Sequence, residues 1–336
     1  MQNRFFIWLN EDASPVGIVP KDYLPQLPIT DYRYFVRILQ YLDELLPREG
    51  LTFVLTWHLD AFHEVMEDAV ILQHGDEQYQ MPWYRGRVRA MFKVSGLRPN
   101  PVWDTLQLPP SIAWRSLLRD ARNSLTRFRR LLTYGPPGKI STPTYELPLG
   151  YFALLDFHPL PIEQRPVDVF FAGSLAVSGW TLRASVAARK QMCAAMSAAQ
   201  KALPQYRIES IWRPPKYDQG LGPAAYTQAL GKAKIALAPR GNTDETYRLI
   251  EAAKLGCVVV SEPLPSRWYF QDCPAVSLRK WSELPGILKS LLNDPAKIRE
   301  LSLRGRQWWD STISEGAVAN FIAQRVAGTG EVRREG

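Results

Sequence analysis

Residues 239–262, PRGNTDETYRLIEAAKLGCVVVSE, decide the fold of the second half of this chain. The apolar run 235–238 just before them predicts a buried strand, and 257–260 (CVVV) predicts another. The residues between these runs show helical spacing, and Gly256 is where the helix is expected to end. Strand, glycine turn, helix and strand together predict a βαβ unit of a parallel sheet.

The turn and helix of this unit carry the charges that point to a ligand. Thr243 or Asp244 is expected to cap the helix through a side-chain oxygen. The helix N-terminus then presents free backbone N–H groups and the positive end of its dipole above the sheet edge. Arg240 lies in the turn, and Arg248 and Glu251 lie three residues apart on one helix face. Cations beside a helix N-terminus, with a carboxylate one turn further, suit a nucleoside diphosphate and its ribose.

The same stretch resembles the carboxy-terminal domain of the exostosin family of glycosyltransferases. That domain reads roughly P-x-G-[DN]-T-x-x-[ST]-x-R-[LF]-x-[DE]-A-x-x-x-G-C-[VI]-P-V, and Val259 is a departure because the family has proline there. Upstream, 168–174 (DVFFAGS) resembles the family's first donor-domain strand, and 147–151 (LPLGY) resembles the element before it. The resemblance covers 147–262. The residues in step with the pattern are Pro239, Gly241, Asn242, Thr243, Thr246, Arg248, Leu249, Glu251, Ala252, Gly256, Cys257, Val258 and Val260.

The resemblance implies an α/β protein of the GT-B class, with two Rossmann-like domains facing a central cleft. The expected domains are an acceptor-side domain at 1–150 and a nucleotide-sugar-binding domain at 151–305. A C-terminal helix at 306–336 is expected to return to the first domain. The expected strands are 4–10, 51–57, 68–73 and 89–94 in the first half, and 167–172, 207–212, 234–238, 257–261 and 275–278 in the second.

The activity implied by the resemblance is transfer of a sugar from a nucleotide sugar, UDP-linked by resemblance, to a hydroxyl of a glycan or glycolipid. Such an enzyme is a hexosyl- or pentosyltransferase, and the donor is a co-substrate, so no cofactor is expected. No D-x-D sequence occurs, so arginines and helix N–H groups are expected to neutralise the diphosphate without a metal ion. Glu251 is expected to bind the ribose. The expected donor-binding residues are Gly173, Arg183, Arg240, Gly241, Asn242, Thr243, Arg248 and Glu251.

Inversion of the sugar's stereochemistry is favoured because the E-x7-E pattern of many retaining GT-B enzymes is absent. With Glu251 as the second glutamate, the first would fall at Thr243. An inverting enzyme needs a general base, and loops after first-domain strands supply one. Asp76 and Glu77 are the preferred candidates, and Asp12 is the next. Glu11 and Asp60 also follow such strands, and for each of these residues a solvated charged turn is the alternative.

Length and composition agree with a two-domain globular protein. The chain has 336 residues, of which 46% are hydrophobic and 22% charged. No run reaches the ~20 apolar residues of a membrane span. Three cysteines, few and odd in number, predict reduced thiols and a cytoplasmic protein.

Residues 111–132 (SIAWRSLLRDARNSLTRFRRLL) place apolar residues at helical spacing among six arginines. A helix packed on the first domain, with a solvated arginine face, is one interpretation. A basic amphipathic helix on an anionic membrane is another, so a membrane-associated protein is an alternative localisation. The formal net charge of +8 also raises nucleic-acid binding, but no binding motif accompanies it, and no nucleic-acid partner is expected. A non-catalytic protein that binds sugar nucleotides or glycans remains the alternative to an enzyme.

Overall fold

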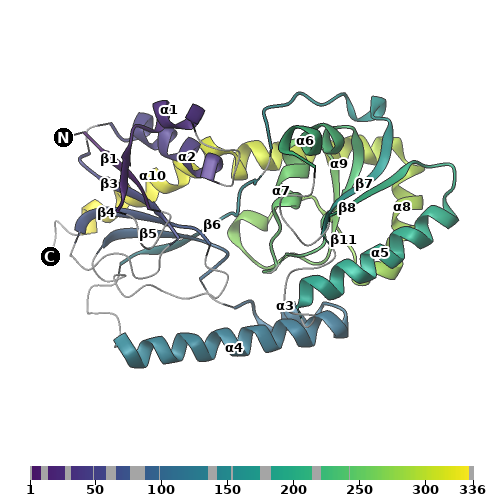
Figure 1. Ribbon diagram of the computed structural model, residues 1–336, viewed down its shortest axis with the longest axis horizontal. Helices are drawn as coiled ribbons and strands as arrows, with labels where there is room; N and C mark the ends of the chain where they lie inside the picture. The colour runs from purple at the N-terminus through teal and green to yellow at the C-terminus, as the bar shows by residue number, and fades with distance from the viewer. Residues whose placement is uncertain are drawn as a thin grey trace. The chain divides into compact units, whose positions relative to one another are not determined.

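The chain divides into two compact units, each built around its own parallel sheet (Figure 1). Unit 1 comprises Met1–Pro99, Asp120–Leu149 and Ser314–Gly336, and unit 2 comprises Asn100–Arg119 and Gly150–Ile313. The computed structural model describes residues 2–8, 14–26, 32–47, 49–57, 66–75, 88–97, 99–134, 142–152, 154–174, 183–213, 221–241 and 243–332.

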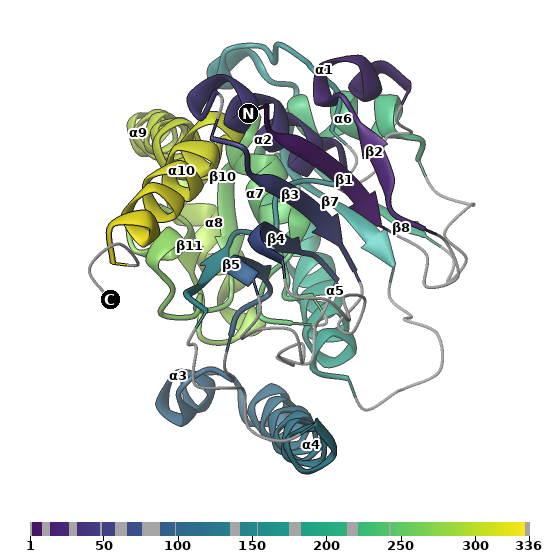
Figure 2. The ribbon, with the colours of Figure 1, turned by 90° about the vertical axis from the view of Figure 1, so that its left-hand side faces the viewer.

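Unit 1 contains a six-stranded sheet in the order β2-β1-β3-β4-β5-β6, in which β2 is antiparallel to β1 and the other neighbours are parallel. The long apolar strands are fully buried in their central parts, as parallel strands covered on both faces are. Figure 2 shows β1, β3 and β4 side by side. The strands are β1 (Arg4–Trp8), β2 (Val16–Ile18), β3 (Thr52–Thr56), β4 (Met66–Gln73), β5 (Val88–Val94) and β6 (Thr144–Leu147).

Helix α2 (Tyr32–Leu45) packs against α10 (Glu315–Val332) within unit 1. The buried face of α2 repeats every three to four residues, as an amphipathic helix requires, and includes Phe35, Leu39 and Leu42. Arg37 of α2 and Glu315 of α10 form an ion pair of 3.4 Å. A short helix, α1 (Pro20–Tyr23), precedes α2.

Unit 2 contains a five-stranded parallel sheet in the order β11-β10-β9-β7-β8. The chain runs from β7 outward to β8 and then returns to the other side of β7 for β9, so the strand order reverses between β7 and β9. This reversal is the mark of a doubly wound sheet. The strands are β7 (Val167–Ser174), β8 (Ile208–Arg213), β9 (Ala233–Leu237), β10 (Val258–Ser261) and β11 (Val276–Ser277).

The helices of unit 2 connect and cover these strands. Residues Met192, Ala195, Met196 and Ala199 of α5 join the buried cluster that the sheet and α8 form. Helix α9 is followed by one π-helical segment, Trp309–Ile313, and then by α10 of unit 1. The α-helices are α3 (Val102–Leu106), α4 (Pro110–Tyr134), whose first residues belong to unit 2, α5 (Ala184–Ala202), α6 (Pro223–Gly231), α7 (Tyr247–Lys254), α8 (Leu284–Leu292) and α9 (Pro295–Trp308).

The α/β class with two parallel-sheet units is confirmed, and each strand expected from the sequence is present with its ends shifted by a few residues. Two expectations need correction. Helix α7 begins at Tyr247 rather than after Thr243 or Asp244, although it does end before Gly256, which has a φ of +67°. Residues 100–119 belong to unit 2, not to the first domain, because their polar side chains bond to the loop after β9. Strands β2 and β6 were not expected.

None of the helices in the described ranges is both long enough and apolar enough to cross a membrane.

The three cysteines are free thiols with different surroundings. Burial raises the pKa of Cys257, and burial raises the pKa of Cys273 to about 12. At pH 8 a thiol with that pKa is ionised to only about one part in ten thousand, and the thiolate is the reactive form. We expect iodoacetamide to alkylate the partly exposed Cys193 first, as followed by mass spectrometry. Labelling of Cys273 at the rate of Cys193 would contradict this assignment.

Candidate anion-binding site in unit 2

The reversal of strand order between β7 and β9 locates the candidate site. In doubly wound sheets, ligands bind outside the carboxyl ends of the strands at such a reversal. Strand β7 ends there with Gly173 and Ser174, and β9 is followed by the loop 238–246, which leads into α7. The residues around these two strand ends therefore make up the candidate site.

Arg248, in the first turn of α7, lies at this position. Its Nε donates a hydrogen bond of 2.9 Å to the carbonyl oxygen of Ala172 in β7, and its guanidinium carbon lies 4.6 Å from the centre of the Phe171 ring. Its Nη1 is buried and has no hydrogen-bond partner in the part of the chain that the structure describes. A buried donor on a cation is costly unless an acceptor meets it, and an anion is the most favourable acceptor.

Gly173 is a glycine because the arginine lies against it. A Cβ atom placed on Gly173 would come within 2.7 Å of Nη2 of Arg248 and 2.8 Å of Cζ of Phe171. Both contacts are shorter than a real side chain allows, so any larger residue would push the guanidinium away from the strand end. Because Gly173 has no side chain, the guanidinium of Arg248 can lie directly against the backbone at the end of β7.

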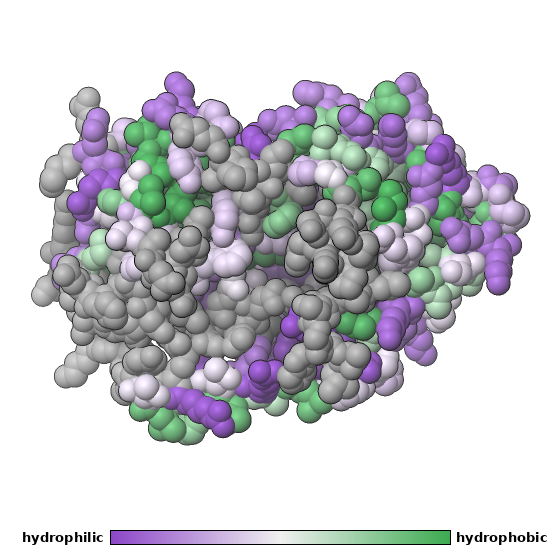
Figure 3. All heavy atoms as spheres, viewed as in Figure 1, coloured by the Kyte–Doolittle hydropathy of each residue, from purple (hydrophilic) through white to green (hydrophobic). Residues whose placement is uncertain are grey.

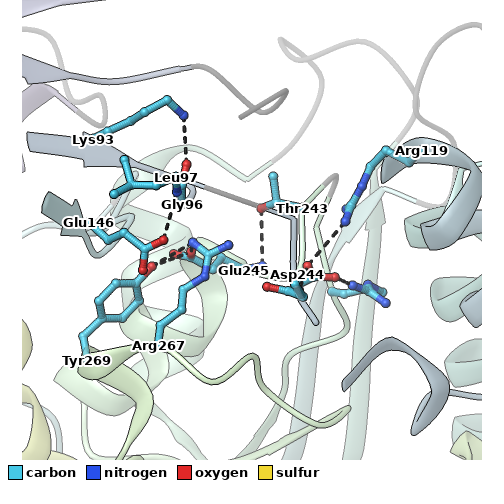
Figure 4. Close-up of polar contacts among 12 residues, drawn as sticks. Lys93, Gly96, Leu97, Arg119, Glu146, Thr243, Asp244, Glu245, Arg267 and Tyr269 are labelled. Atoms are coloured by element: carbon cyan, nitrogen blue, oxygen red, sulfur yellow. Dashed lines mark hydrogen bonds and ion pairs between the residues drawn. The ribbon is translucent and has the colours of Figure 1, made fainter. Parts of the chain in front are cut away.

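Arg240, in contrast, is held inside the unit. Its side chain is buried, forms an ion pair with Asp244 and donates a hydrogen bond of 3.1 Å from Nη1 to Oγ of Ser116. Asp244 also accepts a hydrogen bond from Asn100 and forms an ion pair of 3.4 Å with Arg119 (Figure 4). The charge of Arg240 is thus compensated by a carboxylate, which distinguishes it from Arg248.

The loop between β9 and α7 closes on itself. The N–H of Gly241 donates to the carbonyl oxygen of Glu245 at 3.2 Å, and a Cβ on Gly241 would clash with that oxygen. Oγ1 of Thr243 accepts the N–H of Glu245 at 3.3 Å, so Thr243 caps this turn rather than the helix. Asn242 lies outside the described residues.

Two buried carboxylates, those of Glu245 and Glu262, hold the loop 238–246 in place through hydrogen bonds and an ion pair. Glu245 accepts a hydrogen bond of 2.6 Å from the Tyr269 hydroxyl and forms an ion pair with Arg267 (Figure 4). Burial is the main cause that raises the pKa of Tyr269 well above its usual range. Glu262, after β10, accepts the backbone N–H of Arg240 at 2.9 Å and Nε1 of Trp281 at 2.8 Å. Burial raises the pKa of Glu262, against the effect of the nearby Arg240 guanidinium.

Glu251 is buried, and both of its carboxylate oxygens accept hydrogen bonds within unit 2. Oε1 accepts the backbone N–H of Phe152 at 3.0 Å, and Oε2 accepts the Tyr226 hydroxyl at 2.6 Å. These bonds tie the start of unit 2's main segment and α6 to α7.

Arg183 occupies the N-cap position of α5, and its side chain makes no capping hydrogen bond. Residues 175–182 before it lie outside the described ranges. Arg189, one to two turns further along α5, was not singled out from the sequence, yet its Nη1 donates to the carbonyl oxygen of Ser174 at 3.0 Å. A second arginine therefore contacts the end of β7.

The candidate general bases Asp76, Glu77 and Asp12, and the alternative Asp60, lie outside the described residues. Just before Asp76, at the end of β4, Gln73 is 1% exposed, and neither polar atom of its amide has a hydrogen-bond partner among the described residues. His74 follows it and stacks on Trp57 with ring centres 5.4 Å apart, and Trp57 is 41% exposed. The sequence reasoning missed this polar and aromatic group, although all three residues follow or end predicted strands.

No group of three or more His, Cys, Asp or Glu side chains that could bind a metal ion occurs in the described ranges.

Comparison with known proteins shows only remote likeness. No family model and no curated protein matches the sequence. Among solved structures, the GtfA/B complex matches with a TM-score of 0.46 and 13% sequence identity. The match covers 79% of this chain and 58% of the matched chain of that complex, so this chain spans little more than half of its length. The N-terminal domain of trehalose-6-phosphate phosphatase from Candida albicans matches with a TM-score of 0.47 and 10% identity, over 92% of this chain and 81% of that one. Sucrose-phosphate synthase from Thermosynechococcus elongatus matches with a TM-score of 0.45 and 12% identity, over 96% and 82%. At these scores the likeness carries no argument about function.

Proposed function

We propose that this protein is a GT-B glycosyltransferase similar to the exostosin family. In this proposal it transfers a hexosyl or pentosyl group from a nucleotide sugar, UDP-linked by resemblance, to a hydroxyl of a glycan or glycolipid in the cytoplasm. The observation that carries the proposal is the buried Nη1 of Arg248, which lies at the strand reversal of a doubly wound sheet and meets no acceptor from the described residues.

The donor diphosphate is assigned to Arg248 and to the loop that leads into α7, with Gly241, Asn242 and Thr243 as the loop residues that the resemblance implies; Gly241 shapes this loop through its N–H bond to the Glu245 carbonyl. Gly173 keeps the space that Arg248 occupies. Arg183, at the start of α5, is assigned to the diphosphate as well, and Arg240 contributes by holding the loop in shape through Asp244. Glu251 is assigned to the ribose.

The proposed reaction is a single displacement with inversion and without a metal ion. A carboxylate of unit 1 removes the proton of the acceptor hydroxyl, and the oxygen then bonds to the anomeric carbon as the bond to the diphosphate oxygen breaks. The leaving diphosphate gains negative charge, which the guanidinium of Arg248 stabilises. Asp76, Glu77 and Asp12 are the candidate bases.

The acceptor is assigned to the carboxyl end of the unit 1 sheet. The exposed ring of Trp57 offers a face on which a sugar ring can pack, and the buried amide of Gln73, at the end of the neighbouring strand β4, has a donor and an acceptor without partners among the described residues. Small ligands are commonly bound by this combination of aromatic surface and a few polar groups.

A thermal-shift screen of UDP, GDP, CDP, dTDP and ADP, each with and without EDTA, tests the donor site. A ligand that binds only the folded state raises its stability, by about 2.7 kcal/mol at a hundred times its Kd. We expect one nucleotide to raise Tm without regard to EDTA, and the rise to be lost in Glu251→Gln. Tyr226→Phe is the matched control, since it removes one of the bonds that Glu251 makes in the structure but leaves its carboxylate in place.

Two results of this screen would count against the proposal. Equal loss of the nucleotide effect in Tyr226→Phe and Glu251→Gln would assign Glu251 a structural role only. Failure of all five nucleotides to raise Tm would remove the donor site itself.

The alternative is a non-catalytic protein that binds sugar nucleotides or glycans. Single changes of Asp76, Glu77 and Asp12 to Asn separate the two. In a transferase, one of these variants keeps the nucleotide-induced rise in Tm and loses turnover of the nucleotide sugar. A wild-type protein that binds the nucleotide but releases none from any nucleotide sugar, with a panel of glycan acceptors, supports the binding protein.

A further inference from the structure

The polarity of helix α4 (Pro110–Tyr134) is the reverse of that of a helix packed on a domain by its apolar face. The side chains of Ser116, Asp120 and Asn123 are buried. After the first turn, where Ile112 is buried, most of the large apolar residues lie on the outside, and Phe128 and Leu132 are 56% and 71% exposed. The interpretation that 111–132 packs on the first domain by its apolar face is therefore wrong, although Arg122 and Arg129 are exposed as it expected.

Most of the exposed apolar residues of α4 form one continuous line, which we call the α4 stripe. Its members follow one another at intervals of four and three residues, so they share one face of the helix along its length. Hydrophobic and hydrophilic residues lie side by side along α4 at the lower edge of Figure 3. The stripe consists of Trp114, Leu118, Ala121, Leu125, Phe128 and Leu132.

Cationic residues border the stripe on one flank. At 100° per residue, Arg115, Arg122 and Arg129 fall between the stripe and the opposite face. The helix contains six arginines and a single acidic residue, Asp120, which is buried. The exposed surface of α4 is thus apolar and positively charged.

Helix α3 adds to this surface. It lies next to the first half of α4 in both ribbon views (Figures 1 and 2). Three of its five residues are large, apolar and exposed: Val102 at 54%, Trp103 at 70% and Leu106 at 63%. Exposed tryptophan beside arginine is typical of segments that bind at the boundary of a lipid bilayer.

An anionic lipid surface matches this combination better than other partners do. Pairing of two α4 stripes in a dimer would bring rows of arginine together without acidic residues on either helix to offset them. A nucleic acid would suit the arginines but would leave the apolar stripe in water. A bilayer that contains anionic lipids accepts the apolar stripe between its headgroups and offers phosphates to the arginines.

We propose that α4, together with α3, binds peripherally to membranes that contain anionic lipids. The helix lies in the plane of the interface, with the α4 stripe inserted at the level of the headgroups. The inference stands without the proposed function, but it deepens it, since it would bring the protein to a lipid-linked acceptor.

Co-sedimentation of the full chain with lipid vesicles, without any nucleotide, tests the proposal. We expect binding to vesicles of phosphatidylcholine mixed with phosphatidylglycerol, weakening as salt rises, and little binding to phosphatidylcholine alone. Leu125→Ser/Phe128→Ser and Arg122→Gln/Arg129→Gln are each expected to weaken binding by roughly tenfold or more. Leu303→Ser is the matched control, because Leu303 on α9 is also 59% exposed but lies outside this surface.

The four changed residues of the double variants are exposed, so the variants are expected to fold, and an unchanged Tm verifies this. Equal binding to both vesicle types, or equal losses in the stripe variant and Leu303→Ser, would overturn the proposal. So would self-association in analytical ultracentrifugation that the stripe variant abolishes, if no vesicle binding accompanies it. Because the vesicle assay contains no nucleotide sugar, it tests membrane binding alone. Its result does not depend on whether the proposed transferase activity is correct.

Discussion

Arg248→Met is expected to lower kcat/KM for the nucleotide sugar by about a hundredfold to a thousandfold, the loss typical for removal of one group that stabilises developing charge. Methionine fills the space beside Gly173 and Phe171 but offers no charge and no donor. The free energy of unfolding should fall by only about 1 kcal/mol, the usual net contribution of one hydrogen bond, because the variant loses the bond from Nε to the Ala172 carbonyl while Nη1 has no partner among the described residues. Steady-state kinetics and a thermal melt measure the two effects.

Gly173→Ala provides the internal control for this prediction. The added methyl group would meet Nη2 of Arg248 at 2.7 Å, so the arginine must shift and donor turnover should fall. In the Gly173→Ala/Arg248→Met double variant the two losses should not add, since the glycine acts through the arginine. Additive losses would show that Gly173 acts on the ligand directly, and unchanged kinetics in Arg248→Met would remove this residue from the site.

Arg267→Met is expected to destabilise unit 2 by about 3–5 kcal/mol, the usual cost of leaving one partner of a buried ion pair uncompensated. Arg267 and Glu245 are both buried, and the Tyr269 hydroxyl bonds to both of them. Without the arginine, the carboxylate of Glu245 stays in a site from which water is excluded. Urea unfolding followed by tryptophan fluorescence gives the change in the free energy of unfolding.

Two further variants make this prediction specific. Arg267→Met/Glu245→Gln removes both charges and should recover a large part of the lost stability. Arg299→Met breaks the exposed 3.7 Å ion pair with Glu163 and should change the free energy of unfolding by less than about 1 kcal/mol. A loss in Arg267→Met no larger than that in Arg299→Met would mean that the Arg267–Glu245 pair does not hold the loop.

The strands could be predicted from the sequence because each is a short apolar run bounded by polar or turn residues, a local pattern that can be recognised before the neighbouring strands are known. Runs such as 235–238 and 257–260, rich in aliphatic residues and only four long, are typical of strands buried on both faces. The end of α7 was equally local, because Gly256 adopts a positive φ that other residues avoid. The start of α7 was misplaced because Thr243 bonds within the loop and Asp244 is engaged by Asn100 and Arg119.

The candidate site could be predicted as a set of residues but not as an arrangement. The motif places Arg240 and Arg248 eight residues apart and makes them look alike. Only the folded chain pairs Arg240 with Asp244 and directs Arg248 to the end of β7. Asp244 is only four residues from Arg240, but both side chains also contact residues more than 100 positions away, Ser116 and Arg119, and no local pattern predicts these distant contacts.

By itself, the sequence determined the α/β class, the βαβ unit around 239–262 and the place where its helix ends, because these depend on apolar periodicity and on the backbone freedom of glycine. The tertiary structure alone decided which arginine is paired with a carboxylate and which face of α4 is turned to solvent. Periodicity shows that α4 has an apolar face, but burial depends on what the rest of the chain offers to cover it. Here the described chain covers Ser116, Asp120 and Asn123 instead, and the apolar stripe remains exposed.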